Sequence, residues 1–478
     1  MESNRREFLK GMAMAAGAVG VTTGCASAAG GAGEGGGAPM RNFRCAPMKR
    51  IRVGVVGCGA RGTGAVRRLP SIPGLEVVAV CDIRPECAER AVKAVEEKTG
   101  RKPLSFTGSD EEFKRLCDLP QVDVVYNTTS WNAHAKVSLY ALNAGKHTFI
   151  EVPSALYLDD CWALVETAER VKRHCMQLEN CCYGEMEMLA FNLCRLGKLG
   201  KLVHAEGAYI HDLRTYNYGD WYESSPGRDE KTGSDAYWNF WRLRYNAAHK
   251  GNQYPTHGLG PICWYMDINR GDRLDYLVSL ESNSFNFEEY TKAAFPSDSW
   301  KAKLKVEMGD MNMMLIKTKN GRSIMIQHDV STPRPYSRIN TITGTKGIFA
   351  DYPFRLALED KPGAGAHRFF PDEKANEIRQ EFMHPLWKQY GEMARKIGDH
   401  DGMDFLMVLR LAYCLQNGLP LDQNVYDLAS WSCLCELSEK SVRNHSTPME
   451  IPDFTRGAWK TTPPLGDLSV DPATIGLA

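Results

Sequence analysis

Three glycines follow a short apolar run, with the spacing Gly57-x-Gly59-x-x-Gly62. In a strand–turn–helix unit the first glycine permits a tight turn, the second lets a pyrophosphate approach the backbone, and the third lets the helix pack on the strand. The helix N-terminus adds free N–H donors and the positive end of the helix dipole. A second apolar run ends at Asp82, near the separation of about 20 residues at which a carboxylate binds ribose hydroxyls. We interpret this pattern as a dinucleotide-binding site.

Asp82 favours NAD over NADP, because a carboxylate at this position repels the additional phosphate of NADP. Arg84 lies two residues further along the chain and leaves NADP open, since an arginine can accommodate that phosphate. NAD is therefore the expected cofactor.

The elements that must position this site alternate between strand and helix from residue 49 to residue 180, which predicts a doubly wound parallel sheet of the Rossmann type. The expected strands are 52–56, 77–81, 122–127, 147–150 and 176–179, and the expected helices include 110–117, 133–144 and 158–174. Ligands bind beyond the carboxyl ends of such strands. Three further stretches follow predicted strands, at residues 128–134, 151–153 and 180, and we expect them beside the glycine turn.

The pattern changes after residue 180, where longer strands with few helices predict an α+β domain with an open, mostly antiparallel sheet. The expected strands are 202–210, 277–280, 303–307, 313–317, 323–327, 340–343 and 348–351, and the expected helices are 186–199, 381–397, 404–417 and 425–438. The predicted organisation is an export signal and linker at 1–48, a Rossmann domain at 49–180, a substrate-binding domain at 181–460 and a tail at 461–478.

The N-terminal residues resemble a twin-arginine export signal, with Arg5 and Arg6 before a short segment rich in glycine and alanine. Cys25 follows Thr-Thr-Gly in a loose lipoprotein cleavage box, which makes it a candidate site for a lipid anchor. Residues 26–39 form a Gly/Ala linker. We therefore expect export by the twin-arginine pathway, to the periplasm or the cell envelope.

The composition argues against nucleic acid as a partner, because 58 lysines and arginines balance 58 aspartates and glutamates. The 15 cysteines are scattered, with no CxxC spacing, so we expect no metal site and mostly buried thiols. Homo-oligomerisation is left open.

With these residues in place, the chain resembles glycoside hydrolase family 109, the NAD-dependent α-N-acetylgalactosaminidases, within the Gfo/Idh/MocA oxidoreductase superfamily. The most specific matching stretches are Tyr254-Pro-Thr-His257-Gly and Met266-Asp-Ile-Asn-Arg270-Gly. Others are Trp131-Asn-Ala-His134, Glu151-Val152, and Tyr209-Ile-His211-Asp-Leu-Arg214. The resemblance spans nearly the whole chain after the predicted signal.

The resemblance implies two groups of binding residues. The implied contacts to NAD are Ala60, Arg61, Asp82, Trp131, Asn132, Ala133, His134, Glu151, Val152, Asn180 and Arg242, beside Gly57, Gly59 and Gly62 of the turn. The implied contacts to a sugar are Tyr209, Tyr254, Pro255, Thr256, His257 and Tyr336. The implied substrate is a glycan that ends in N-acetylgalactosamine.

Two departures from the wider superfamily bear on the reaction. Most members carry Glu-Lys-Pro, with the lysine near the reacting hydroxyl, whereas this chain has Val152 at that position. An apolar side chain transfers no proton, so a simple sugar dehydrogenase is less well supported. Asn132 and Ala133 stand where some relatives have larger side chains, which alters the expected fit around the cofactor.

The implied reaction is a hydrolysis that uses a redox cycle, with oxidation at the sugar C3, removal of the C2 proton, elimination at C1, addition of water and reduction. NAD is then tightly bound and regenerated at each turnover. His257 is our first candidate for proton transfer, since its unperturbed pKa lies near neutrality. Tyr183 follows the predicted strand end at Asn180, and we expect it at the nicotinamide pocket as the second catalytic residue. His211 and Asp212 end a strand and could bind substrate or cap a turn.

Three alternatives stay open at this point. The first is an NAD(P)-dependent sugar oxidoreductase, which would need cofactor exchange, and the second is a glycan-binding protein without activity. The third is a conventional glycosidase in which two of Glu151, Glu179 and Asp212 face each other across a cleft.

Overall fold

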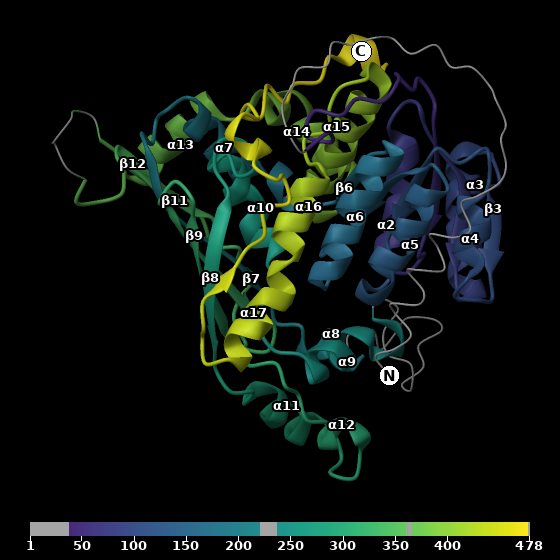
Figure 1. Cartoon of the computed structure of the whole chain (residues 1–478), viewed down its shortest axis with the longest axis horizontal. Helices are drawn as coiled ribbons and strands as arrows, with labels where there is room; N and C mark the ends of the chain where they lie inside the picture. The colour runs from purple at the N-terminus through teal and green to yellow at the C-terminus, as the bar shows by residue number, and fades with distance from the viewer. Residues whose placement is uncertain (1–37, 220–236, 360, 362–365, 477–478) are drawn as a thin grey trace. The chain divides into compact units, whose positions relative to one another are not determined.

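The computed structural model describes residues 38–219, 237–359, 361 and 366–476 (Figure 1). The predicted export signal and Cys25 lie outside the described residues. No helix in the described part of the chain is both long and apolar enough to span a bilayer.

The first half of the described chain forms a six-stranded parallel sheet with the order β3-β2-β1-β4-β5-β6. The strands are β1 (Ile51–Val56), β2 (Leu75–Asp82), β3 (Leu104–Thr107), β4 (Val124–Asn127), β5 (His147–Ile150) and β6 (Cys175–Gln177). They alternate with helices α2 (Ala60–Arg68), α3 (Pro85–Thr99), α4 (Glu112–Cys117), α5 (Trp131–Asn143) and α6 (Leu158–Val171). The predicted Rossmann sheet is thus confirmed, and the strand that the sequence missed, β3, is an edge strand whose side chains are mostly exposed.

The second half forms an eight-stranded mixed sheet with the order β13-β12-β11-β7-β10-β9-β8-β14, in which only β7 and β10 are parallel neighbours. The strands are β7 (Leu202–Ile210), β8 (Leu274–Glu281), β9 (Asn312–Thr318), β10 (Ser323–Asp329), β11 (Thr341–Gly344), β12 (Gly347–Ala350), β13 (Arg355–Leu358) and β14 (Met449–Glu450). This confirms the expected mostly antiparallel sheet.

Helices form in the segments between these strands and after them. They are α7 (Glu185–Arg195), α8 (Arg214–Tyr218), α9 (Trp241–Ala248), α10 (Thr256–Tyr265), α11 (Asn286–Ala294), α12 (Trp300–Lys303), α13 (Asp372–Phe382), α14 (Pro385–Ile397), α15 (Met403–Asn417), α16 (Val425–Ser432), α17 (Leu434–Arg443) and α18 (Pro472–Ile475). Although α16 comes late in the sequence, it packs beside α6 of the parallel sheet (Figure 1). Helix α15 contacts β1.

Three expected elements differ from the structure. The strand predicted at 303–307 is wrong: α12 ends at Lys303, and the segment after it bonds to the end of α9 through Glu307 N–H and Met308 N–H. The helix predicted at 381–397 starts only at Pro385, since proline fits the first turn of a helix but not its interior. The helix predicted at 425–438 is divided into α16 and α17 at Cys433. The domain boundaries stay a prediction.

Candidate functional site

The glycine turn joins β1 to α2 with the geometry that a bound phosphate requires. Gly57 has a φ of +90°, which L side chains rarely adopt, and a Cβ on Gly62 would lie 1.8 Å from the carbonyl oxygen of Gly57. Gly59 is the N-cap of α2, and no side chain caps that helix. The first N–H groups of α2 are therefore left for a ligand, so the turn fits the pyrophosphate of a dinucleotide.

Asp82 ends β2 and turns its carboxylate toward the glycine turn. Its Oδ2 accepts a hydrogen bond from Cys58 N–H at 2.6 Å, and its Oδ1 accepts one from Arg84 N–H at 2.9 Å. Asp82 is buried, so these bonds place the carboxylate beside the turn, where ribose hydroxyls can reach it. The residues present therefore fit NAD.

The loops after β4 and β5 are tied to each other. The Trp131 indole donates to the carbonyl of Val152 at 3.1 Å, and the two ring nitrogens of His134 lie 2.8 and 2.9 Å from the carbonyl oxygens of Pro153 and Thr129. Burial lowers the pKa of His134 despite these carbonyls. Both residues thus hold the two loops together, while Asn132 is exposed and Ala133 half-buried on α5. Their predicted contacts to NAD stay predictions.

Asp404, at the start of α15, joins three of the residues that the sequence assigned to the cofactor. The Arg61 guanidinium bonds to Glu151 at 2.6 Å and to Asp404 at 3.0 Å, and the Asn180 amide donates to Asp404 at 3.0 Å. Although Asp404 is fully buried, Arg61 and Arg68 hold its pKa well below the ordinary value. The Arg61 side chain is therefore occupied by two carboxylates, and its backbone N–H on α2 is the group left facing the glycine turn.

His257 forms a dyad with a buried carboxylate at the carboxyl end of the parallel sheet. Its Nδ1 lies 2.7 Å from Oε1 of Glu179, which is fully buried, whereas the His257 side chain keeps 12% of its exposure. Burial opposes the charge on Glu179, but His257 holds the pKa of this carboxyl below its usual value. Nδ1–H can thus donate to Glu179, which leaves Nε2 of the neutral ring as a base.

Two glycines after His257 allow α10 to reach this position. A Cβ on Gly258 would lie 2.4 Å from the backbone nitrogen of Ala208 in β7, and a Cβ on Gly260 would lie 2.7 Å from Cγ of Glu179. The helix therefore rests directly on β7 and on the dyad carboxylate. Pro255 is the N-cap of α10, and Thr256 is its buried first residue.

Aromatic side chains from three segments form a group, two members of which lie against the dyad. The rings of Tyr209 and Tyr254 have centroids 4.5 Å apart, and each lies edge-on to His257, at 5.5 and 4.8 Å. Tyr336 lies 6.4 Å from Tyr209, and His211 lies 5.2 Å from Tyr336. We call Tyr209, Tyr254, Tyr336 and His211 the aromatic cluster; it offers the hydroxyls and ring faces that sugars bind.

Arg242 connects the aromatic cluster to the cofactor loops. Its guanidinium carbon lies 4.8 Å from the centroid of the Trp131 ring, 5.7 Å from that of Tyr209 and 5.3 Å from that of Tyr254. Arg242 is buried, and its Nε and Nη2 have no hydrogen-bond partner among the described residues. A buried cation with unused donors suits an anionic or strongly polar ligand atom between the two parts of the site.

Tyr183 lies outside this group, contrary to our expectation. It is fully buried, its hydroxyl donates to Asp422 at 2.9 Å, and its ring packs edge-on to Trp264 at 5.2 Å. Asp422 is in turn paired with Arg410 at 2.7 Å. Because the hydroxyl is satisfied inside the core, we assign Tyr183 no catalytic role.

The three carboxylates of the two-carboxylate alternative each have a separate partner. Glu151 bonds to Arg61, Glu179 to His257, and Asp212 to Arg214 at 2.7 Å. Burial raises the pKa of Asp212, but Arg214 brings it below the ordinary value overall. An acid of such an enzyme needs a raised pKa, which neither Glu179 nor Asp212 has.

Among the described residues, Glu179, Cys181 and His257 each place one donor atom within 4.8 Å of the others, a set that could hold a metal ion. Two of the three donors are already bonded to each other in the dyad, so the expectation of no metal stays a prediction. As the sequence led us to expect, the described cysteines other than Cys45 and Cys194 are buried.

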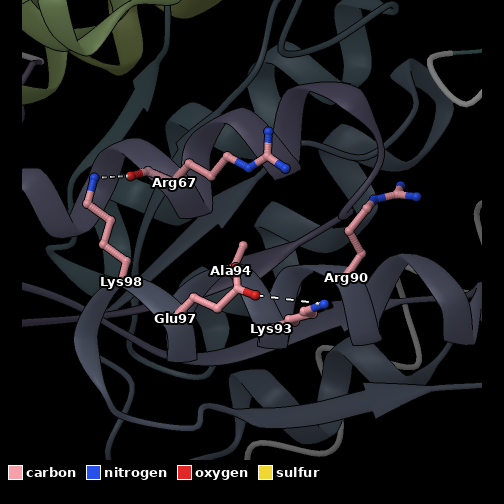
Figure 2. Close-up of a pocket in the computed structure, with 6 residues that line it drawn as sticks. All are labelled: Arg67, Arg90, Lys93, Ala94, Glu97 and Lys98. Carbon is pink, nitrogen blue, oxygen red and sulfur yellow. Dashed lines mark hydrogen bonds and ion pairs between the residues drawn. The ribbon is translucent and has the colours of Figure 1, made fainter.

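A pocket on the surface over α2 and α3 is separate from this site (Figure 2). Lys98 there donates to the carbonyl of Arg67 at 2.7 Å, and Lys93 pairs with Glu97. Arg90 and Ala94 complete the lining. None of the predicted cofactor or sugar residues is among them.

Comparison with known proteins decides the family. The model described as "Glycosyl hydrolase 109, C-terminal domain" matches residues 183–461, and the model described as "Oxidoreductase family, NAD-binding Rossmann fold" matches residues 51–178. The chain belongs to glycosyl hydrolase family 109. Its N-terminal part carries the NAD-binding Rossmann domain of the Gfo/Idh/MocA type.

Relatives of this family 109 chain align over most of its length. A "Glycosyl hydrolase family 109 protein 2" from Shewanella sp. (strain ANA-3) is 44% identical over 466 residues, which cover 97% of this chain and 98% of the relative. A family 109 protein from Shewanella pealeana is 44% identical over 419 residues, 88% of each chain. A solved structure of levoglucosan dehydrogenase with NADH and levoglucosan shares the fold, with a TM-score of 0.60 and 17% identity over 84% of this chain and 100% of that one.

Sequence reasoning missed Asp404, and it also missed the ion pair of Glu187 and Arg338, whose side chains lie 2.7 Å apart and of which Arg338 bonds to Tyr336. Asp404 is separated from Arg61 by 343 residues, and no local pattern links two such positions. The sequence did carry one signal for the dyad, because Gly258 and Gly260 follow His257 and glycine often marks a close approach of backbone.

Proposed function

We propose that this family 109 protein is an α-N-acetylgalactosaminidase that retains its NAD and regenerates it at every turnover. The observation that supports this most is the position of the His257–Glu179 dyad. It lies against Tyr209 and Tyr254 of the aromatic cluster, and that cluster reaches the cofactor loops through Arg242 and Trp131. A proton-transfer group, a sugar-binding surface and a dinucleotide motif thus meet at one edge of the parallel sheet.

NAD bound there would supply an acceptor that takes a hydride from the sugar C3 and returns it later, so that no net oxidation occurs. The chain's own residues then need to move one proton at C2. His257 suits this task, because Glu179 bonds to the ring at Nδ1 and Nε2 is left for a ligand. No hydrogen bond to Nε2 is formed within the described residues.

The aromatic cluster has the second task of binding and orienting the sugar. Burial, partly offset by Arg242, raises the pKa of Tyr209, and burial also raises the pKa of Tyr254. Both phenols therefore remain neutral donors at physiological pH. The buried charge of Arg242 lies within 6 Å of both rings and would stabilise negative charge that develops on a sugar oxygen.

Val152 supports hydrolysis over net oxidation of a sugar. Its side chain is buried and apolar, and its carbonyl is occupied by Trp131. No lysine stands at this position to deprotonate a sugar hydroxyl, which an NAD(P)-dependent oxidoreductase of the superfamily pattern would use.

The first experiment measures release of 4-nitrophenol from α- and β-linked N-acetylgalactosaminides by the purified protein without added NAD. We expect release from the α-anomer, with no net formation of NADH. Product formed in deuterated water should carry deuterium at C2, because the C2 proton is removed and replaced. Unlabelled product, together with the absence of an isotope effect from substrate deuterated at C2, would contradict the proposal and favour direct displacement at C1.

We also propose export by the twin-arginine pathway, with Arg5 and Arg6 as the signal pair and Cys25 as the lipid-anchor candidate. A cofactor that is regenerated at each turnover needs no supply outside the cytoplasm, which fits this destination. Lysine at both positions should leave precursor in the cytoplasm, as measured by cell fractionation. Unchanged export of that variant would contradict the pathway.

A further inference from the structure

Tyr336 differs from the other tyrosines of the aromatic cluster in the partner of its hydroxyl group. Nη1 of Arg338 donates to the Tyr336 oxygen at 2.9 Å, so this oxygen is an acceptor. A phenol has one O–H donor, and none of the described residues accepts from it. The Tyr336 proton is therefore free to be donated to a ligand.

Arg338 is itself held rigidly. Its Nε and Nη2 bond to Oε1 of Glu187 at 2.8 and 2.7 Å, and both residues are buried. Glu187 lies in the first turn of α7, where the helix dipole favours a carboxylate. A Cβ on Gly184 would lie 2.0 Å from Oε2 of Glu187, so only glycine at this position leaves room for the carboxylate.

The backbone beside Tyr336 is fixed as well. Ser337 exchanges two hydrogen bonds with Ile210 at the end of β7, each of 3.1 Å. Ile210 lies between Tyr209 and His211, so these bonds bring Tyr336 to the cluster, with its ring 5.2 Å from that of His211. Backbone pairing thus sets the place of Tyr336, and Arg338 sets the direction of its hydroxyl.

The core contains a contrasting arrangement of the same residue types. Tyr183 donates its proton to Asp422, which is paired with Arg410. There the phenol donates its proton in a hydrogen bond to a carboxylate. At Tyr336 the order is reversed, because the arginine lies between the carboxylate and the phenol.

We propose that Arg338, anchored by Glu187, is a positioning residue that orients Tyr336 as a hydrogen-bond donor to the sugar. Tyr336 is 39% exposed, so the residue is open to a ligand. The inference rests on the proposed function, in which Tyr336 contacts the sugar.

The test removes Arg338 in a background in which Glu187 is already Gln, since loss of Arg338 alone would leave the buried Glu187 carboxylate unpaired. It therefore compares Glu187→Gln with Glu187→Gln/Arg338→Met. In protein labelled with 3-fluorotyrosine, the ¹⁹F resonance of residue 336 is assigned with Tyr336→Phe and followed against pH. Loss of the nearby cation should raise the titration midpoint by about one pH unit. The matched control, Asp422→Asn/Arg410→Met, removes a buried pair of the same kind and should leave this resonance unmoved. An unchanged midpoint on loss of Arg338 would overturn the inference.

The second arm is a double-mutant cycle on release of 4-nitrophenol. Arg338→Met in the Glu187→Gln background should lower kcat/KM about tenfold or more, but less than about threefold when residue 336 is Phe. An equal loss in both backgrounds would show a structural role and overturn the inference. A wild-type protein that releases no 4-nitrophenol would instead contradict the proposed function, and the ¹⁹F titration would still decide the role of Arg338.

Discussion

At the scale of single residues, the chemistry depends on which partner each titratable group meets. His257 and His328 both lie beside Tyr209, with ring centroids at 5.5 and 6.3 Å. His257 has a carboxylate on Nδ1 and is partly accessible. Burial lowers the pKa of His328 to about 3, and its buried Nε2 has no partner in the described part of the chain. Of these two histidines, His257 is therefore the candidate for proton exchange with a ligand.

We therefore expect His257→Gln to lower kcat by roughly 100- to 10,000-fold, the usual range for a general acid–base group. The affinity for NAD should stay within about twofold, because His257 bonds to Glu179 and not to the glycine turn. Initial rates and NAD titration measure the two quantities. His204→Gln, on β7 but bonded to Ser323, is the control; a variant at His257 with full activity would remove it from the mechanism.

We expect Asp82 to have a structural role and a binding role. It bonds to the backbone of the glycine turn, and its carboxylate is the expected ligand of the ribose. Asp82→Ala leaves Cys58 N–H and Arg84 N–H without their acceptor and removes the carboxylate that we expect to contact the ribose. We expect the Kd for NAD to rise tenfold or more, which corresponds to about 1.4 kcal/mol. Isothermal titration after removal of bound cofactor measures this. An alanine variant that retains all of its NAD through dialysis would exclude the assignment.

At the scale of elements, α10 can present His257 only because it has no side chains at two contact points. Gly260→Ala would place a methyl group 2.7 Å from Cγ of Glu179 and force the dyad apart. Overpacking of this kind typically costs about 1–3 kcal/mol, and activity should fall at least tenfold. Denaturant unfolding and initial rates measure both effects. Gly466→Ala, which meets nothing within 4 Å, should be silent; a fully active variant at residue 260 would show that α10 can shift without loss.

Helix α2 of the parallel sheet is bonded to α15, which comes much later in the chain. Asp404 on α15 bonds to Arg61 on α2 and to Asn180 after β6. Helix α15 therefore contacts the edge of the parallel sheet at which we expect the cofactor, although the sequence places this helix in the other predicted domain.

At the scale of the whole molecule, buried histidines make stability depend on pH. Burial lowers the pKa of five of the described histidines to about 3 or about 4: His147, His174, His211, His328 and His384. In the unfolded chain histidine has a pKa near 6.5, so the unfolded state binds more protons between about pH 6.5 and the folded pKa. Each histidine then lowers the free energy of unfolding by up to about 1.4 kcal/mol for each unit of acidification.

We expect the Tm to fall steeply from about pH 6.5 to about pH 4, before carboxylates with depressed pKa, such as Asp404, titrate. Thermal unfolding across this range measures the slope. His384→Gln should flatten it, and exposed His445 replaced by Gln should not. A Tm that stays level down to about pH 5 would contradict this account.

The sequence by itself determined the features that depend on neighbours in the chain. The glycine turn, Asp82 and the alternation of strands and helices are local patterns, and the parallel sheet and the mixed sheet both follow from them. Residues at the carboxyl ends of parallel strands could be placed at one edge for the same reason. The strand expected at 303–307 failed because its alternating apolar residues pack against a small cluster and not in a sheet.

Only the tertiary structure decided which distant side chains become partners. Tyr183 follows a strand end as Asn180 does, yet it turns into the core toward Asp422, while Asn180 meets Asp404. Glu179 became the partner of His257, and Arg338 the partner of Tyr336, through contacts between elements far apart in sequence. The physical reason is that hydrogen bonds and ion pairs act over a few ångströms in space, whereas the patterns readable in a sequence act over a few residues.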